Sequence, residues 1–182
     1  RIAFRFRQVH TYSVYRLCLT DTLPAGYAPP GVEIREAGRE ELKKLRKGRS
    51  DLTEYFYRDE TEALDRSWVG LQGGKLGFIA WVSYRGSELV RCGPKEAKVS
   101  YVYCMKELRG KHMTTNAVLM IARTLRQEGL ASLLAVPDSD NPTVVKAFLV
   151  CGFEKIGSIK RIGPLSWPPT PVDYSKKVRP CE

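Results

Sequence analysis

The segment of this sequence with the most specific chemistry is a basic turn, Arg109-Gly110-Lys111, between two regular elements. Residues 98–105 before it are β-branched and aromatic and predict a strand, and residues 114–127 after it predict an amphipathic helix. The first N–H groups of a helix have no intrahelical partner, and the helix dipole adds partial positive charge at that end. With the two cations, these groups favour an anion such as a phosphate. Read alone, the turn also fits a solvated loop, because it holds one glycine rather than several.

Two further features lie downstream of this turn. Asn141-Pro142 is an N-cap and first-turn pair and predicts a helix that runs to Cys151. Gly152-Phe153 ends that helix and begins a further strand, while a short apolar strand is predicted over 132–136. The second half of the chain is therefore predicted to run strand, helix, strand, helix, strand.

This order of elements resembles the acetyl-CoA module of the GNAT superfamily, the GCN5-related N-acetyltransferases. The resemblance covers about residues 32–162 in element order and is most specific over 98–157. The family's turn has Gln or Arg, two variable residues, Gly, one variable residue, and Gly or Ala, and its backbone amides hold the cofactor's pyrophosphate. Here Arg109 takes the first position, whereas His112 and Thr114 stand in the places of the small residues. Because the backbone amides survive any such substitution, the resemblance still implies phosphate binding at this turn.

The resemblance also implies which residues contact acetyl-CoA or another acyl-CoA. In the family, the strand before the turn splays from its neighbour and its backbone holds the pantetheine arm and the acyl carbonyl. Asn141 matches a family asparagine that contacts pantetheine, a role compatible with helix capping. The implied cofactor-binding residues are Val102, Tyr103, Cys104, Arg109, Gly110, Lys111, His112, Met113, Thr114, Thr115, Asn141 and Phe148.

The residues that usually transfer protons in the family are replaced in this chain. Phe148 stands where many members have a tyrosine acid, and Lys98 where many have a glutamate base, with Glu96 two residues earlier. If Lys98 faces the site, its charge lowers the pKa of the acceptor amine and attracts an acidic acceptor; the alternative is a solvent-facing lysine without a role. The catalytic residues stay unassigned, and the candidates are Glu96, Lys98, Tyr101, Tyr103 and His112.

The elements that must position these residues predict an α/β (α+β) protein with a mixed, mostly antiparallel, twisted sheet flanked by helices, as in GNAT proteins. Its 182 residues suit one domain, which we assign to 1–163 with a Pro-rich tail over 164–182 that lies extended on the surface. The other predicted elements are an additional N-terminal strand over 10–20, a strand over 32–35, helices over 40–47 and within 51–66, and a hairpin of 67–72 and 75–84.

Composition limits the classes of partner and compartment. A net charge of +10 favours anionic partners, which include phosphate-rich ligands, acidic membrane surfaces and nucleic acid. Five cysteines without a close pair predict reduced thiols in a cytoplasmic protein, and two histidines predict no metal centre. The sequence has neither an 18-residue apolar run nor an apolar N-terminal segment, so we expect no membrane span and no signal peptide.

The function that the resemblance implies is direct transfer of an acyl group, most simply acetyl, from CoA to an amine. The acceptor is not specified, although the basic charge favours an acidic or sugar-derived molecule over a polyamine. Two alternatives remain open: a GNAT-like binding module with little or no catalysis, and a basic nucleic-acid-binding domain, which the charge favours less. The sequence also leaves a homodimer open.

Overall fold

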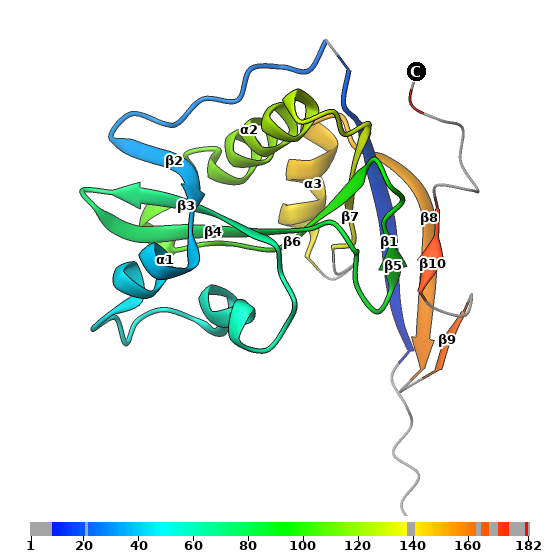
Figure 1. Ribbon diagram of the computed structural model, residues 1–182, viewed down its shortest axis with the longest axis horizontal. Coiled ribbons are helices and arrows are strands. Elements are labelled where there is room, and N and C mark those ends of the chain that lie inside the picture. The colour runs from blue at the N-terminus through cyan, green and yellow to red at the C-terminus, as the bar shows by residue number, and fades with distance from the viewer. Residues whose placement is uncertain are drawn as a thin grey trace, which may run out of the picture.

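A large mixed sheet runs through the molecule (Figure 1). The computed structural model describes residues 9–20, 22–137, 141–162, 165–167, 171–174 and 181, with residues 162 and 165–167 described by their backbone. Within this part of the chain, eight strands form one sheet in the order β2-β3-β4-β6-β7-β1-β8-β9. All neighbouring pairs are antiparallel except β6 and β7, which confirms the mixed, mostly antiparallel sheet predicted from the sequence. The strands are β1 (Val9–Cys18), β2 (Val32–Ala37), β3 (Arg66–Gln72), β4 (Lys75–Ser83), β6 (Glu96–Cys104), β7 (Ser132–Ala135), β8 (Glu154–Ile162) and β9 (Leu165–Trp167).

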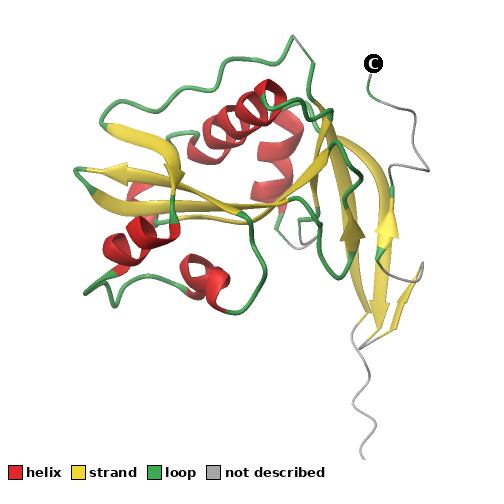
Figure 2. Cartoon of the chain, in the orientation of Figure 1, coloured by secondary structure: helices red, strands yellow, loops and turns green. Residues whose placement is uncertain are grey.

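Helices cover the two faces of this sheet (Figure 2). Helices α2 (Met113–Gln127) and α3 (Pro142–Val150) lie on one face, and α1 (Arg39–Arg46) and the 3-10 helix η1 (Glu54–Glu60) lie on the other. A short 3-10 helix, η2 (Lys106–Leu108), precedes α2. The apolar positions of α2 face the sheet, as their spacing predicts, and four of them are almost fully buried: Val118, Ile121, Ala122 and Leu125.

The second helical stretch predicted within 51–66 is present as a short 3-10 helix rather than an α-helix. The segment forms only η1, and Arg66 already begins β3. Phe56 is fully buried, and the Trp81 indole N–H donates to the Tyr55 carbonyl oxygen at 2.9 Å. A contact from a distant strand thus fixes this segment, which local spacing does not reveal.

The additional N-terminal strand forms β1, and it lies inside the sheet rather than at an edge. It pairs with β7 on one side and β8 on the other, so that Tyr15 lies opposite both Ala135 and Lys155. Val14 and Leu17 are buried by these neighbours. The two strands that flank α3 in the sequence are therefore separated in space by the N-terminal segment.

Part of the C-terminal segment packs into the core. Strand β10 (Val172–Asp173) pairs in parallel with β5 (Val90–Arg91), and Val172 and Tyr174 are 4% and 6% exposed. A Cβ atom on Gly157 would lie 2.5 Å from the Tyr174 ring, so glycine allows this close approach. The expected surface position is therefore wrong for Val172 and Tyr174, because they complete a cluster of buried residues on the face away from α2. The division between domain and tail at residue 163 stays a prediction, and residues 163–164 lie outside the described residues.

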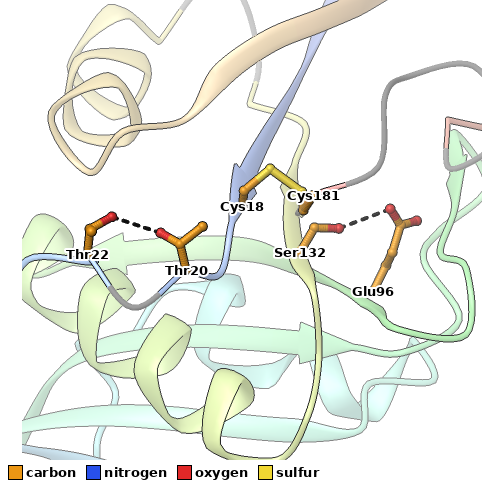
Figure 3. Close-up of a disulfide and its surroundings, with 6 residues drawn as sticks. All are labelled: Cys18, Thr20, Thr22, Glu96, Ser132 and Cys181. Atoms are coloured by element: carbon orange, nitrogen blue, oxygen red, sulfur yellow. Dashed lines mark hydrogen bonds between the residues drawn. A yellow bond between two sulfur atoms is a disulfide. The ribbon is translucent and has the colours of Figure 1, made fainter.

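A disulfide joins Cys18 at the end of β1 to Cys181, with 5.5 Å between their Cα atoms (Figure 3). The prediction that all cysteines are reduced is wrong for this pair. The two residues are 163 positions apart, so no local spacing indicates their pairing. The other cysteines, Cys92, Cys104 and Cys151, are free thiols. Within the described residues no helix is long and apolar enough to span a membrane, and no three His, Cys, Asp or Glu side chains group as metal ligands.

Candidate functional site

The parallel strands β6 and β7 separate part of the way along their length. Their pairing begins at Glu96 and Ser132 and, within the described residues, ends at Val99 and Ala135. Strand β6 continues to Cys104, which lies opposite Phe78 of β4. Beyond Val99, the backbone N–H and C=O groups of β6 that face β7 are thus no longer paired with that strand and can bind another partner.

A β-bulge marks the place where the two strands separate. Between Ile79 and Trp81 of β4, strand β6 contains an additional residue, and Tyr101 has a φ of +48°. A positive φ is uncommon for an aromatic residue, and such backbone is often found at functional sites. The Tyr101 hydroxyl donates to Glu62, and the Arg58 guanidinium lies 4.8 Å from the centre of the Tyr101 ring. These contacts hold the bulge from the face opposite α2.

The predicted anion-binding turn follows β6 directly. Gly110 and His112 have φ angles of +76° and +55°, which reverse the chain between η2 and α2. The Arg109 Nε–H donates to the Cys104 carbonyl oxygen at 3.1 Å. The first hydrogen bond of α2 runs from the Asn116 N–H to the His112 oxygen at 3.0 Å, so the N–H groups of residues 113–115 precede the helical ladder.

A cleft of about 630 Å³ connects the open part of β6 with this turn. Its walls are the end of β6, residues 108–115 and one face of α3. All the predicted cofactor-binding residues line it except Lys111, which is exposed beside a second groove, and Phe148. Phe148 is 2% exposed and packs against Phe153, with 4.9 Å between the ring centres. The structure therefore places Phe148 in the core rather than on the cleft wall.

Sequence reasoning missed the residues that α3 contributes to the cleft. Five residues of α3 line it: Thr143, Val144, Lys146, Ala147 and Val150. Counted from Thr143, three of the others follow at i+3, i+4 and i+7, which places them on one face of the helix. This spacing was a usable signal, because it marks the α3 face opposite the buried Phe148. Asn141 caps the same helix, with its side-chain oxygen accepting the Val144 N–H at 3.3 Å.

Tyr103 lies at the junction of the cleft with the η1 side of the molecule. Its ring stacks on Tyr55 with 5.1 Å between centres and meets Phe56 edge-on at 5.7 Å. The Arg109 guanidinium carbon lies 5.9 Å from the same ring. These contacts fix the position of Tyr103 at the mouth of the open ladder.

Glu96, a candidate base, lies at the opposite end of β6 from the turn. Its two carboxylate oxygens accept the Gly93 N–H at 2.9 Å and the Ser132 hydroxyl at 3.0 Å. Figure 3 shows the hydrogen bond between Ser132 and Glu96 near the disulfide. Glu96 does not line the cleft, and its contacts hold the start of β6 against β7.

Lys98 is a buried lysine on the face away from α2. It lies opposite Ser83 of β4 and Leu134 of β7, and opposite residues of neighbouring strands share a face. Only 8% of Lys98 is exposed, so the solvent-facing alternative is wrong. Burial lowers the pKa of its ammonium, which has neither a hydrogen bond nor an ion pair within the described part of the chain. The buried Ser100 hydroxyl, two residues along the same strand, also lacks a partner among the described residues.

The two thiols closest to the cleft are poor nucleophiles. Burial raises the pKa of Cys104 to about 11 and that of Cys151 to about 12. The Cys151 thiol donates to the Thr115 carbonyl oxygen at 3.6 Å. Because the thiolate is the reactive form, both cysteines are expected to remain protonated at neutral pH.

Solved structures of GCN5-related N-acetyltransferases resemble this architecture. One from Sphaerobacter thermophilus has a TM-score of 0.61 and 14% identity over 84% of this chain and 50% of its own. One from Kribbella flavida has a TM-score of 0.55 and 14% identity over 81% of this chain and 55% of its own. AAC(6')-Iy in complex with the bisubstrate analogue CoA-S-monomethyl-acetylneamine has a TM-score of 0.51 and 16% identity, over 69% of this chain and 92% of its own.

These likenesses establish the fold, which is the GNAT fold. The chain spans about half the length of the Sphaerobacter and Kribbella structures that it matches. No family model and no curated protein matches the sequence.

Proposed function

We propose that this chain, whose fold is that of the GNAT N-acetyltransferases, is an acyl-CoA-dependent N-acyltransferase. One observation carries the proposal: the open part of the β6–β7 ladder leads directly to the N-terminus of α2 through one cleft. Strand amides on one side and helix N–H groups on the other suit a ligand with an amide-bearing arm and a phosphate end. CoA has this chemistry, and acyl-CoA supplies an activated thioester when bound.

The turn leaves room for this ligand at two positions. Gly110 leaves open space where a Cβ would be, and the His112 side chain is exposed instead of filling the turn. The N–H groups of residues 113–115 and the Arg109 charge would hold phosphate, and the backbone of Val102 and Cys104 would hold the pantetheine arm.

The acceptor is proposed to be an amine that carries its own acidic group. Lys98 is a buried cation with no hydrogen bond in the described chain, and the buried Ser100 hydroxyl lacks a partner there. A carboxylate or phosphate would satisfy both groups. The Lys98 charge would also favour the neutral form of a nearby amine, which is the form that attacks a thioester. Direct transfer then forms the nitrogen–carbon bond and breaks the carbon–sulfur bond. Water takes the proton that the amine loses, and solvent protonates the departing thiolate, because Phe148 has no proton to give.

A thiol-release assay with acetyl-CoA and matched amines tests the proposal. We expect faster release with glycine than with glycinamide, because only glycine presents a carboxylate to Lys98, and less preference in Lys98→Met. Equal rates for the two amines would contradict the proposal that the acceptor carries an acidic group.

A second candidate is a binding module without turnover, which the burial of Phe148 and the absence of a tyrosine acid at that position favour. Binding of acetyl-CoA without thiol release for any amine class would support this candidate over the enzyme. The disulfide favours an oxidising compartment over the cytoplasmic location that the cysteine count predicted.

A further inference from the structure

A groove of about 610 Å³ lies at the opposite end of β6 from the turn, where β6 is still paired with β7. Its walls come from the hairpin between β4 and β6, from the start of β6 and from the segment between α2 and β7, and we call it the hairpin groove. The described residues that line it are Tyr84, Arg85, Arg91, Cys92, Gly93, Pro94, Glu96 and Leu130. None of these residues lines the candidate cleft, so a ligand here would be distinct from the ligand of the cleft.

The backbone of the hairpin is fixed by its own hydrogen bonds. The Ser87 N–H donates to the Val90 carbonyl oxygen at 2.7 Å, and the Cys92 N–H donates to the Arg85 carbonyl oxygen at 3.4 Å. Gly86 has a φ of +87°, and a Cβ atom there would overlap the Val90 carbonyl oxygen, so glycine lets the hairpin close. On its other side, β5 pairs with β10 (Figure 1). The hairpin is thus ordered before any ligand binds, which lowers the entropic cost of binding.

Two arginines of the hairpin groove are without a protein partner. Arg85 and Arg91 are exposed, and within the described part of the chain neither forms a hydrogen bond or an ion pair. By contrast, Arg46, Arg49 and Arg66 each have a carboxylate partner. The guanidinium donors of Arg85 and Arg91 are therefore available to a ligand.

Glu96 is the one acidic residue among the described residues that line the groove, and its carboxylate is already occupied. Its two oxygens accept the Gly93 N–H and the Ser132 hydroxyl, and only 9% of the residue is exposed. Asp173 lies opposite Arg91 on β10 but does not line the groove. Two free guanidinium groups against one buried carboxylate leave the groove positively charged.

The remaining walls of the groove are aromatic and apolar. The Tyr84 hydroxyl accepts from the Arg66 guanidinium at 2.8 Å, and the Tyr84 N–H donates to Asp65 at 2.8 Å, so both ends of this residue are fixed. Pro94 and Leu130 also line the groove. Guanidinium groups beside a ring and two apolar side chains suit an anion that carries an organic part.

We propose that the hairpin groove is a binding site for a small organic phosphate, separate from the acyl-CoA cleft. A phosphate monoester carries about two negative charges at neutral pH and three strong acceptor oxygens. These match the forked donors of Arg85 and Arg91, and the organic part would lie against Tyr84, Pro94 and Leu130. The proposal goes beyond the acyltransferase function and does not depend on it.

Calorimetric titration with phenyl phosphate tests the site, because this probe has one phosphate and one ring. We expect a loss of affinity of up to about fivefold in Arg85→Gln or Arg91→Gln, and of up to about twenty-five-fold in the double variant. Arg39→Gln is the matched control: Arg39 is exposed on α1, does not line the groove, and its replacement should keep the parent's affinity. Failure of the parent to bind, unchanged affinity in the double variant, or an equal loss in Arg39→Gln would overturn the inference.

Two competing ligands test the class of ligand and its place. Inorganic phosphate lacks the ring and should bind the parent more weakly than phenyl phosphate; equal affinity would overturn the organic ligand. Saturating acetyl-CoA should leave the dissociation constant of phenyl phosphate unchanged, because the groove and the cleft share no described residue. Displacement of phenyl phosphate by acetyl-CoA would place the probe in the cleft and overturn the inference. Failure of acetyl-CoA to bind would contradict the proposed function and leave the phenyl phosphate titration unaffected.

Discussion

Where β6 and β7 separate, backbone groups dominate one face of the sheet and buried charged side chains dominate the other. On the α2 side, the cleft is made largely of backbone: the unpaired edge of β6, the reversal at Gly110 and His112, and the first N–H groups of α2. On the opposite side, charged side chains are buried, among them Lys98 of β6 and Arg46 of α1. A site made of backbone tolerates a change of side chain, whereas removing one partner of a buried ion pair leaves the other charge buried alone. Substitutions on the two sides should therefore differ in cost.

The largest expected effect is loss of the ion pair that joins α1 to η1. Arg46 and Asp59 lie 2.6 Å apart with side chains 5% and 10% exposed, and Arg46 also lies over the Tyr57 and Trp81 rings. Arg46→Ala leaves Asp59 buried without its partner, so we expect a loss of about 3–5 kcal/mol in the free energy of unfolding. Urea denaturation measures this loss.

The matched control for this variant is Arg49→Ala, which removes the more exposed pair with Asp51 and should change stability little. Similar losses in the two variants would contradict the contrast between buried and exposed charge.

The disulfide ranks next, because it closes a long loop and holds the C-terminal segment beside β1. Replacing Cys18 and Cys181 together by serine should lower the free energy of unfolding by about 2–4 kcal/mol. The same loss should follow when a dithiol reduces the parent, and the dithiol should leave the double variant unchanged. A parent whose denaturation midpoint is unaffected by reduction would argue that the bond does not stabilise this face.

The sequence predicts features that depend on residues close together in the chain better than features that depend on distant residues. The turn at 109–115 and helix α2 lie within one short segment, so their pattern indicates both the elements and the cleft that they form. The insertion of β1 between β7 and β8, the Cys18–Cys181 bond and the contact of Trp81 with η1 depend on residues far apart in the chain. Phe148 was assigned to the cofactor because a family position was carried over, whereas its helical phase places it in the core.

Lys98 offers a test of the buried side through pH. Burial lowers its pKa in the folded state below the unfolded value of 10.5, so within that window the unfolded chain binds more protons. Stability should therefore rise with pH through the window, and the desolvation cost should persist in full below it. Lys98→Met should be at least as stable as the parent at pH 7, with the difference shrinking toward pH 10.5. Parallel stability curves for the two proteins would show that the lysine is not desolvated.

The smallest effect is expected on the backbone side, at His112. Its φ of +55° strains a non-glycine residue, while glycine adds freedom to the unfolded chain. Because these contributions oppose each other, His112→Gly should lie within about 1 kcal/mol of the parent and should bind acetyl-CoA with similar affinity. A large loss of affinity, measured by calorimetry, would mean that the imidazole rather than the backbone holds the ligand.

Titration of the parent with acetyl-CoA, followed by thermal unfolding, tests the central claim that the cleft binds an acyl-CoA. At about one hundred times the dissociation constant, binding should add about 2.7 kcal/mol and raise the melting temperature by about 5–10 °C. Arg109→Glu should reduce the shift, and more so at low salt, because the charge acts on phosphate through screened solvent. No shift at millimolar acetyl-CoA or a longer acyl-CoA would contradict the account, as would an unchanged shift in Arg109→Glu.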